Sequence, residues 1–224
     1  MTTPTPGTFL AKLNDAEREA LLALGTVRKF PRGSALMYQG EREDRMTILL
    51  DGRVKVTRID DQGHEALLSI RDAGDLLGEL AFIDGDARVA TVVALEPVEA
   101  LVASAADLRR HLETTPRVAV VLLEIVASRF RDSTIKRSQF GTADTMARLA
   151  ARILELAERY GEPSADGVSL TSPLSQEDLA AWTGASRAGV ADALRAMREL
   201  GWLQTDRRTI IVRDVGALRA RAAS

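Results

Sequence analysis

The chain has 224 residues and a formal net charge of −2 at pH 7, with 46% hydrophobic and 28% charged residues, so any surface for a polyanion must be local. The length suffices for two small domains, each with its own core. Cysteine is absent, which excludes disulfides and cysteine-held zinc or iron–sulfur centres, and no run approaches about 20 apolar residues, so we expect no membrane span and a location in the cytoplasm.

The first segment is predicted to be a polar tail followed by one helix. Met1–Thr8 is short, polar and contains proline, without the basic start and apolar core of a secretory signal, and we expect it to be frayed. Between Phe9 and Leu24 the apolar residues recur at helical spacing. These positions are Leu10, Leu13, Ala20, Leu21 and Leu24.

From Val27 to Val102 the period changes to that of short strands. Turns containing glycine or proline separate the apolar runs, for example at 31–33, 51–52 and 61–63. The runs are Ala35–Tyr38, Met46–Leu50, Val54–Ile59, Ala66–Ile70, Val89–Leu95 and Val98–Val102. Many short strands at near-regular spacing predict an antiparallel sandwich or roll.

One segment inside this roll, Gly78–Val92, reads G-E-L-A-F-I-D-G-D-A-R-V-A-T-V and suits a compact anionic ligand. The glycine at 78 lets backbone N–H groups approach a phosphate. The Glu79 carboxylate would accept a hydrogen bond from a ribose hydroxyl, and the Arg88 guanidinium would bind the phosphate as a fork. The neighbouring apolar residues are expected to pack onto the β core: Leu80, Phe82, Ile83, Val89 and Val92.

This segment resembles the phosphate-binding cassette of cyclic-nucleotide-binding domains, and it is named the cassette below. The pattern of that family is G-E-L/A, a short helix and then R-S/T/A-A-T. The matching positions are Gly78, Glu79, Leu80, Arg88, Ala90 and Thr91. Val89 takes the place of a hydroxyl residue that bacterial members often carry, and it would offer the phosphate its backbone N–H. The resemblance implies a cyclic nucleotide as the ligand.

A helical period returns at Ser104, where Asp107 three residues later is typical of a capping box variant. A long helix follows Pro116, a favourable first-turn residue. Its apolar face is wide enough for two contacts, one with the roll and one with a partner copy of the same helix. Cations such as Arg129 and Lys136 argue against the alternative of a helix buried all round in one core. The face comprises Val118, Val121, Leu122, Ile125, Val126 and Phe130.

The third segment, Asp144–Ser224, is predicted to begin with a helix over Met146–Tyr160 and a loop over Gly161–Gly167. The stretch Ser175–Leu203 then has the pattern of a helix-turn-helix. A polar start, a short apolar-faced helix, a small turn and a second amphipathic helix follow one another there. The strands after it would form a wing.

Caps and a turn define this helix-turn-helix. Ser175, with Asp178, would cap the first helix, Ser186 would cap the second, and Gly184 tolerates the positive φ of a tight turn. Two strands around Asp206–Arg208 would form the wing. The inner face of the second helix is expected to consist of Val190, Ala193, Leu194 and Met197.

The second helix is the predicted reader of DNA. Arg187 lies in its first turn, where side chains meet base edges in the major groove, and arginine bound to guanine is the commonest specific contact. Hydroxyls and the amides at the start of the first helix suit phosphates. The predicted DNA contacts are Ser175, Gln176, Ser186, Arg187, Gly189 and Arg195.

The order of roll, long helix and winged helix-turn-helix resembles the CRP/FNR family of bacterial transcription regulators over nearly the whole chain. The recognition helix of the cAMP receptors in that family reads S-R-E-T-V-x-R. Ser186, Arg187 and Val190 match it, whereas Ala188, Gly189 and Asp192 replace the glutamate, the threonine and the second arginine. By resemblance, Ser133 and Thr134 would contact the adenine, and Arg129 would pair with the cassette glutamate.

We therefore predict an α+β protein with a cyclic-nucleotide-binding roll over 1–115, a dimerisation helix over 116–141 and a winged helix-turn-helix over 142–224. The predicted function is a homodimeric regulator that binds palindromic DNA, contacts RNA polymerase and is controlled by a cyclic nucleotide, with cAMP as the first candidate. The alternative is a regulator of the same fold that is constitutive or responds to cGMP or a cyclic dinucleotide. With no nucleophile–base pair and only two histidines, we expect neither an enzyme nor a metal centre.

Overall fold

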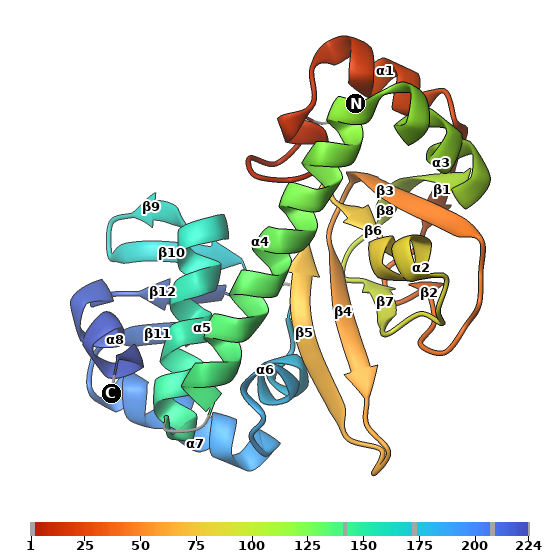
Figure 1. Ribbon diagram of the computed structural model, residues 1–224. Coiled ribbons are helices and arrows are strands. Elements are labelled where there is room, and N and C mark those ends of the chain that lie inside the picture. The colour runs from red at the N-terminus through yellow and green to blue at the C-terminus, as the bar shows by residue number, and fades with distance from the viewer. Residues whose placement is uncertain (1–2, 141–142, 172–173, 207–208, 224) are drawn as a thin grey trace. The chain divides into compact units, whose positions relative to one another are not determined.

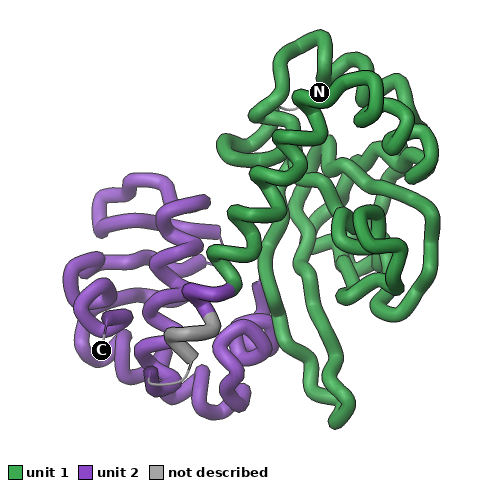
Figure 2. Tube along the Cα trace, in the orientation of Figure 1, with its two compact units in different colours: residues 1–133 green, residues 134–224 purple. Residues whose placement is uncertain are grey.

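The computed structural model describes residues 3–140, 143–171, 174–206 and 209–223, and for 137–140 it describes the backbone alone. Packing divides the chain into two compact units, residues 1–133 and 134–224, and each is described by itself (Figure 2). The division falls within helix α4 (Pro116–Phe140). None of the helices in the described part of the chain has the length and apolar character that a bilayer crossing requires.

The first unit is built on two four-stranded antiparallel sheets, as the short apolar runs predict (Figure 1). One sheet has the order β1 (Gly25–Phe30), β8 (Val98–Ser104), β3 (Arg45–Asp51) and β6 (Leu76–Leu77). The other has the order β2 (Ala35–Met37), β7 (Thr91–Ala94), β4 (Val54–Ile59) and β5 (Glu65–Arg71). The sequence patterns did not separate β1 or β6, because β1 is largely exposed and β6 has only two residues.

The two predictions for the start of the chain are wrong. The expected single helix is a 3-10 turn, η1 (Leu10–Lys12), followed by α1 (Asp15–Leu22), because the Asn14 side chain accepts from the backbone N–H of Glu17 and begins a new helix there. The expected frayed tail is anchored where it is described. The Thr5 N–H donates to the Ala73 carbonyl at 2.9 Å, and Thr8 is buried.

Two apolar clusters stabilise the first unit. One lies between the sheets and consists of Met37, Leu49, Val54, Leu77, Val92, Ala94, Val98 and Ala100. The other joins the β1–β8–β3–β6 sheet to the helices η1, α1, α3 (Ala105–Thr114) and α4, and it includes Phe9, Leu21, Ile48, Leu101, Leu108, Val118, Val121, Leu122 and Ile125. One stripe of the long helix α4 therefore packs against the roll.

The cassette begins with helix α2 (Glu79–Asp84) and continues into β7. Of the apolar residues that we expected to pack on the core, Phe82 and Val92 are buried. The prediction is wrong for Leu80, Ile83 and Val89, which are 40–47% exposed. A helix of this length turns only one face to the sheet, and Val89 precedes the strand, so these three side chains face solvent.

The predicted starts of α3 and α4 are confirmed. The Ser104 hydroxyl accepts from the Asp107 N–H at 3.0 Å and donates to its carboxylate at 2.6 Å. Pro116 is the first residue of α4. Proline suits that position because the first backbone N–H groups of a helix have no partner within it.

The second unit contains the C-terminal end of α4, helix α5 (Thr145–Tyr160) and a small four-stranded sheet. The sheet order is β11 (Leu203–Asp206), β12 (Thr209–Val212), β10 (Gly167–Thr171) and β9 (Glu162–Ser164). The loop expected over Gly161–Gly167 is therefore wrong, because Glu162–Ser164 pairs with β10. A last helix, α8 (Val215–Ala222), was not predicted.

The helix-turn-helix is confirmed as α6 (Gln176–Thr183) and α7 (Arg187–Glu199). Between them Gly184 has φ +60°, the left-handed conformation that the tight turn needs. Strands β11 and β12 form the wing, and Arg207 and Arg208, which the prediction also named, lie outside the described residues.

Candidate functional site

A pocket in the first unit brings together most of the residues predicted to bind a ligand. It is lined by β-strands of the roll, by α2 and by one side chain of α4. Among its lining residues are Gly78, Glu79, Leu80, Arg88, Val89 and Arg129. Gly78 has φ +83°, and a Cβ there would lie 2.0 Å from an Arg88 nitrogen, so the position requires glycine both for its conformation and for the space.

Arg88 is the buried cation of this pocket, with 4% of its surface exposed. Its Nη1 donates to the Gly78 carbonyl at 2.8 Å, and its Nη2 donates to the Glu43 carbonyl at 3.3 Å and also to the Arg45 carbonyl. Burial lowers the pKa of Arg88, and the carboxylates around it oppose that shift. The sequence did not reveal these three carbonyls, because two of them, those of Glu43 and Arg45, lie 45 and 43 residues away along the chain.

The Nε of Arg88 has no hydrogen-bond partner among the described residues, although it is buried. A buried donor without an acceptor is costly, and native structures rarely keep one unless a ligand or water satisfies it. Arg88 therefore keeps an unused donor, and it is the side chain that the cassette pattern assigns to a phosphate.

The Arg129 side chain joins the cassette to the long helix. It lies 2.7 Å from the Glu79 carboxylate and 2.7 Å from the Asp75 carboxylate, and it donates to the Leu76 carbonyl at 2.9 Å. The pairing with Glu79 expected from the resemblance is thus present. Burial disfavours the charge of Arg129, but the carboxylates of Glu79 and Asp75 raise its pKa above the usual value. Asp75 was not predicted from the sequence.

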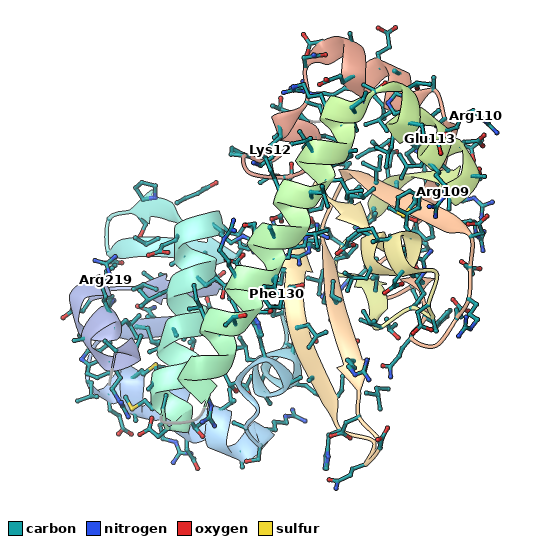
Figure 3. The ribbon with its side chains drawn as sticks, viewed as in Figure 1. Lys12, Arg109, Arg110, Glu113, Phe130 and Arg219 are labelled. Carbon is teal, nitrogen blue, oxygen red and sulfur yellow. The ribbon has the colours of Figure 1, made fainter. Side chains whose placement is uncertain are left out.

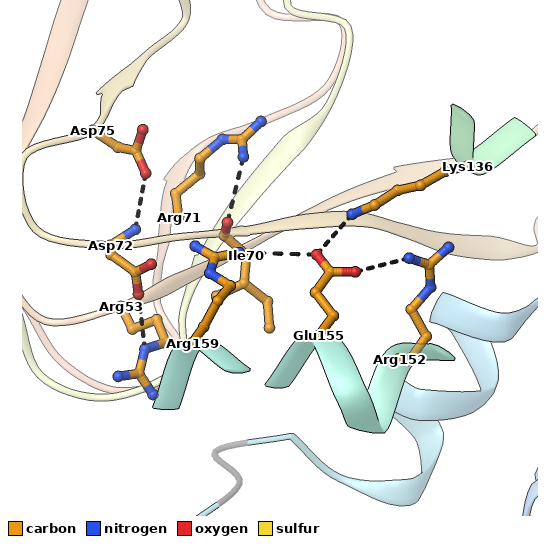
Figure 4. Close-up of polar contacts among 9 residues, drawn as sticks. All are labelled: Arg53, Ile70, Arg71, Asp72, Asp75, Lys136, Arg152, Glu155 and Arg159. Atoms are coloured by element: carbon orange, nitrogen blue, oxygen red, sulfur yellow. Dashed lines mark hydrogen bonds and ion pairs between the residues drawn. The ribbon is translucent and has the colours of Figure 1, made fainter. Parts of the chain in front are cut away.

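One further ion pair and one hydrogen bond stabilise the turn next to this cluster. Arg53 on the β3–β4 connection donates to Asp72 at 3.0 Å, and the Asp75 carboxylate accepts from the Asp72 backbone N–H at 3.1 Å (Figure 4). Asp72 and Asp75 are both more than nine-tenths buried. The turn before the cassette is therefore fixed by charge pairs on both sides.

Neither of the two α4 residues predicted to contact the adenine, Ser133 and Thr134, is among the lining residues of this pocket. Ser133 is exposed, does not line the pocket, and donates instead to the Phe130 carbonyl at 2.8 Å. Thr134 is also exposed and belongs to the second unit.

A second apolar stripe on α4 faces solvent within the first unit. Val120, Leu123 and Phe130 are 54%, 62% and 71% exposed, and Figure 3 marks Phe130 on the helix. Their spacing of three and seven residues is that of the a and d positions of a coiled coil. Four members of the predicted apolar face are buried on another stripe, against the roll: Val118, Val121, Leu122 and Ile125. The sequence analysis included Phe130 in one wide apolar face of this helix, did not separate the two stripes, and did not name Val120 or Leu123.

In the second unit the caps of the helix-turn-helix form as predicted. The Ser175 hydroxyl accepts from the Asp178 N–H at 3.1 Å, and the Ser186 hydroxyl accepts from the Gly189 N–H at 3.1 Å. The inner face of α7 is buried against the unit, as predicted: Val190, Ala193, Leu194 and Met197. Ser175, Gln176, Ser186, Arg187 and Arg195 are all exposed, and Gly189 is half-buried.

A buried charge cluster links α4 to α5 and α6 inside the second unit. Lys136 and Arg152 each donate to the Glu155 carboxylate at 2.8 Å (Figure 4). Both cations lie over the Trp182 ring, at 5.8 and 5.3 Å from its centre. Burial lowers the pKa of Lys136. Burial also acts to raise the pKa of Glu155, but Lys136 and Arg152 outweigh it and lower that pKa. The sequence did not predict this cluster, because its residues belong to three helices and form no local sequence pattern.

Two family models match this chain. The model described as "Cyclic nucleotide-binding domain" matches residues 27–115, and the model described as "Crp-like helix-turn-helix domain" matches residues 147–221. The first covers the cassette and the second covers the helix-turn-helix with its wing. The chain is a transcription regulator with a cyclic nucleotide-binding domain and a DNA-binding domain.

Individual relatives support the same assignment as the two family models. The CRP-like cAMP-activated global transcriptional regulator of Mycobacterium tuberculosis is 31% identical over 193 residues, 86% of each chain. The cyclic AMP receptor protein of Thermus thermophilus is 27% identical over 205 residues, 91% of this chain and 92% of that one. The c-di-GMP responsive regulator CLP of Xanthomonas campestris has the same fold, with a TM-score of 0.79 at 22% identity over 89% of this chain and 99% of that one. The chain belongs to the CRP/FNR family.

Proposed function

We propose that the protein is a homodimeric regulator whose affinity for palindromic DNA is set by a cyclic nucleotide, with cAMP as the first candidate. The roll over 1–115 would bind the nucleotide, the helix over 116–141 would form the dimer, and the unit over 142–224 would bind DNA. The observation that carries the ligand is the buried, unsatisfied Nε of Arg88 beside Glu79. Two relatives whose names state that they are cAMP-activated or receive cAMP support the choice of nucleotide.

In this mechanism the phosphate binds Arg88 and the backbone N–H groups that follow Gly78 and precede Ala90. The ribose hydroxyl donates to Glu79, which already holds Arg129 at 2.7 Å. Because Arg129 is part of α4, the ligand changes the electrostatic surroundings of the dimer helix directly. The nucleotide acts by favouring the DNA-competent dimer over the other arrangement, so its effect equals its differential affinity for the two.

Calorimetry with cAMP, cGMP and cyclic di-GMP tests the ligand. Saturable binding of cAMP, abolished by Arg88→Ala, is the expected result. Val89 in place of a hydroxyl residue is the feature that favours the second candidate, a regulator of another nucleotide or of none. If the protein binds cyclic di-GMP alone, or none of the three nucleotides, the proposal of cAMP as the effector is wrong and the second candidate takes its place.

The exposed stripe of α4 should form the dimer. Leu123→Ser with Phe130→Ser removes four large apolar side chains from a symmetric interface, at about 2 kcal/mol each. We therefore expect dimer dissociation to increase by several orders of magnitude in sedimentation equilibrium. The matched control is Ile59→Ser, which alters a side chain 52% exposed on β4. If the double variant sediments as the wild type does, α4 is not the dimer helix.

Ser133 and Thr134 should couple the nucleotide to DNA across the helix pair. Since Ser133 does not line the pocket of its own chain, its hydroxyl is available to a nucleotide that reaches the dimer helix. Replacing both residues by alanine should reduce the ratio of DNA affinities measured with and without cAMP, by about 5- to 150-fold at most, while the unfolding midpoint stays close to that of the wild type. An unchanged ratio would remove both residues from the coupling.

The DNA site should be a palindrome whose half-sites lie about one helical turn apart, roughly 34 Å, because a two-fold dimer presents two recognition helices. A selection from random duplexes measures this directly. We also propose a contact with RNA polymerase and action in the cytoplasm. Transcription in vitro with purified polymerase, with and without the protein, tests the first of these.

A further inference from the structure

The outward face of the recognition helix α7 carries an acid among the residues predicted to face DNA. Arg187, Ala188, Asp192 and Arg195 are exposed, while the opposite face packs inside the unit. Ala188 precedes Asp192 by four residues, so the two lie on one stripe of the helix, and Ala191 beside them is also small. Short side chains before the acid let the helix approach the bases closely and leave the Asp192 carboxylate projecting.

An acid in this position would normally repel DNA, but here a cation neutralises it. Arg195 pairs with the Oδ1 atom of Asp192 at 2.5 Å, and the two side chains are 61% and 67% exposed. A pair so exposed contributes little to folding stability. The pair uses one carboxylate oxygen, and among the described residues Oδ2 has no hydrogen-bond partner.

Carboxylates accept hydrogen bonds only, and in the major groove cytosine offers a single donor at N4. Adenine offers a donor at N6 beside an acceptor at N7, which a carboxylate cannot satisfy. We propose that Asp192, held by Arg195, reads a cytosine in each half-site, while Arg195 offsets its charge near the phosphates. This inference rests on the proposed function and adds a base preference to it.

Arg187 and Asp192 would then read separate base pairs of one half-site. Five residues of helix span about 7.5 Å along its axis. Base pairs rise about 3.4 Å each, so the two contacts lie roughly two steps apart if the helix follows the groove. A guanine under Arg187 and a cytosine under Asp192 are the pattern to look for.

The test is a selection from random duplexes, run with cAMP and without it on full-length wild type, Asp192→Asn and Glu199→Gln. The asparagine amide both donates and accepts, so it can form two hydrogen bonds with one adenine, at N6 and N7. Asp192→Asn should therefore change the preferred base from cytosine to adenine at one position. The guanine assigned to Arg187 should stay. We expect the preference at the changed position to shift by about 5- to 150-fold. Glu199→Gln removes the same charge from the exposed end of α7 and should keep the cytosine.

The other outcomes are equally clear. If Asp192→Asn binds all duplexes more tightly with unchanged base preferences, Asp192 acts only through its charge and the inference is wrong. If the wild type selects a palindrome without a cytosine at a fixed distance from the guanine, the inference is wrong while the proposed function stands. If the wild type selects no palindrome with or without cAMP, both are overturned.

Discussion

Arg88→Ala should weaken cyclic nucleotide binding by roughly 30- to 1000-fold, or about 2–4 kcal/mol, because a partly buried phosphate loses its charged partner. Calorimetry measures the loss. Arg88 also donates to the carbonyls of Gly78, Glu43 and Arg45, so the variant leaves three acceptors without this donor. Chemical denaturation of the unliganded protein will give the separate cost to stability.

The control for that experiment is Arg42→Ala. Arg42 is 72% exposed, pairs with Asp86 at 3.1 Å beside the cassette, and does not line the pocket. It should bind nucleotide nearly as the wild type does. If Arg88→Ala also keeps near wild-type affinity while remaining folded, the cassette does not use this arginine for phosphate.

Arg187→Ala should weaken DNA binding by about 1–3 kcal/mol per half-site and relax the preference at one base pair of each half. Arg187 is the first residue of α7 and is exposed, and the positions where the cAMP receptors have two further base-reading residues hold Ala188 and Asp192 here. Competition binding against duplexes changed at single positions measures both effects.

Arg219→Ala serves as the matched control, because Arg219 is an exposed cation of α8 in the same unit, 3.7 Å from Glu158. Its loss should change affinity little and equally for all duplexes. Two results would show that Arg187 does not read a base as assigned. One is an Arg187→Ala variant with an unaltered base preference, and the other is a wild-type selection that returns the site of the cAMP receptors unchanged.

Local chemistry explains which parts of the fold could be predicted. The caps at Ser104, Ser175 and Ser186 and the turn at Gly184 depend on residues within a few positions of one another, and all of them formed. The sequence did not predict strand β9, because Glu162–Ser164 has no apolar alternation and is a strand only through its pairing with β10. The break before α1 was not predicted either, because the prediction followed the apolar spacing and overlooked the cap at Asn14.

The residues of the candidate site likewise divide into those that a local pattern predicts and those that depend on long-range packing. Gly78, Glu79 and Arg88 follow from a short pattern, and the structure brings them to one pocket with Arg129. Asp75, which shares Arg129 with Glu79, and the carbonyls that hold Arg88 depend on long-range packing. The cluster of Lys136, Glu155 and Trp182 likewise joins three helices, and no spacing in the sequence distinguishes it from solvated charges.

The anchoring of Arg88 has a consequence for the sensitivity of the regulator. A phosphate that recruits Nη2 would compete with the carbonyls of Glu43 and Arg45, so the stability of the β2–β3 loop and of the start of β3 would enter the binding constant of the nucleotide. The nucleotide concentration at half-response then depends on residues that never touch the ligand. Under the proposed control by a nucleotide, substitutions in that loop would change the response threshold of the protein without altering a residue that contacts the ligand.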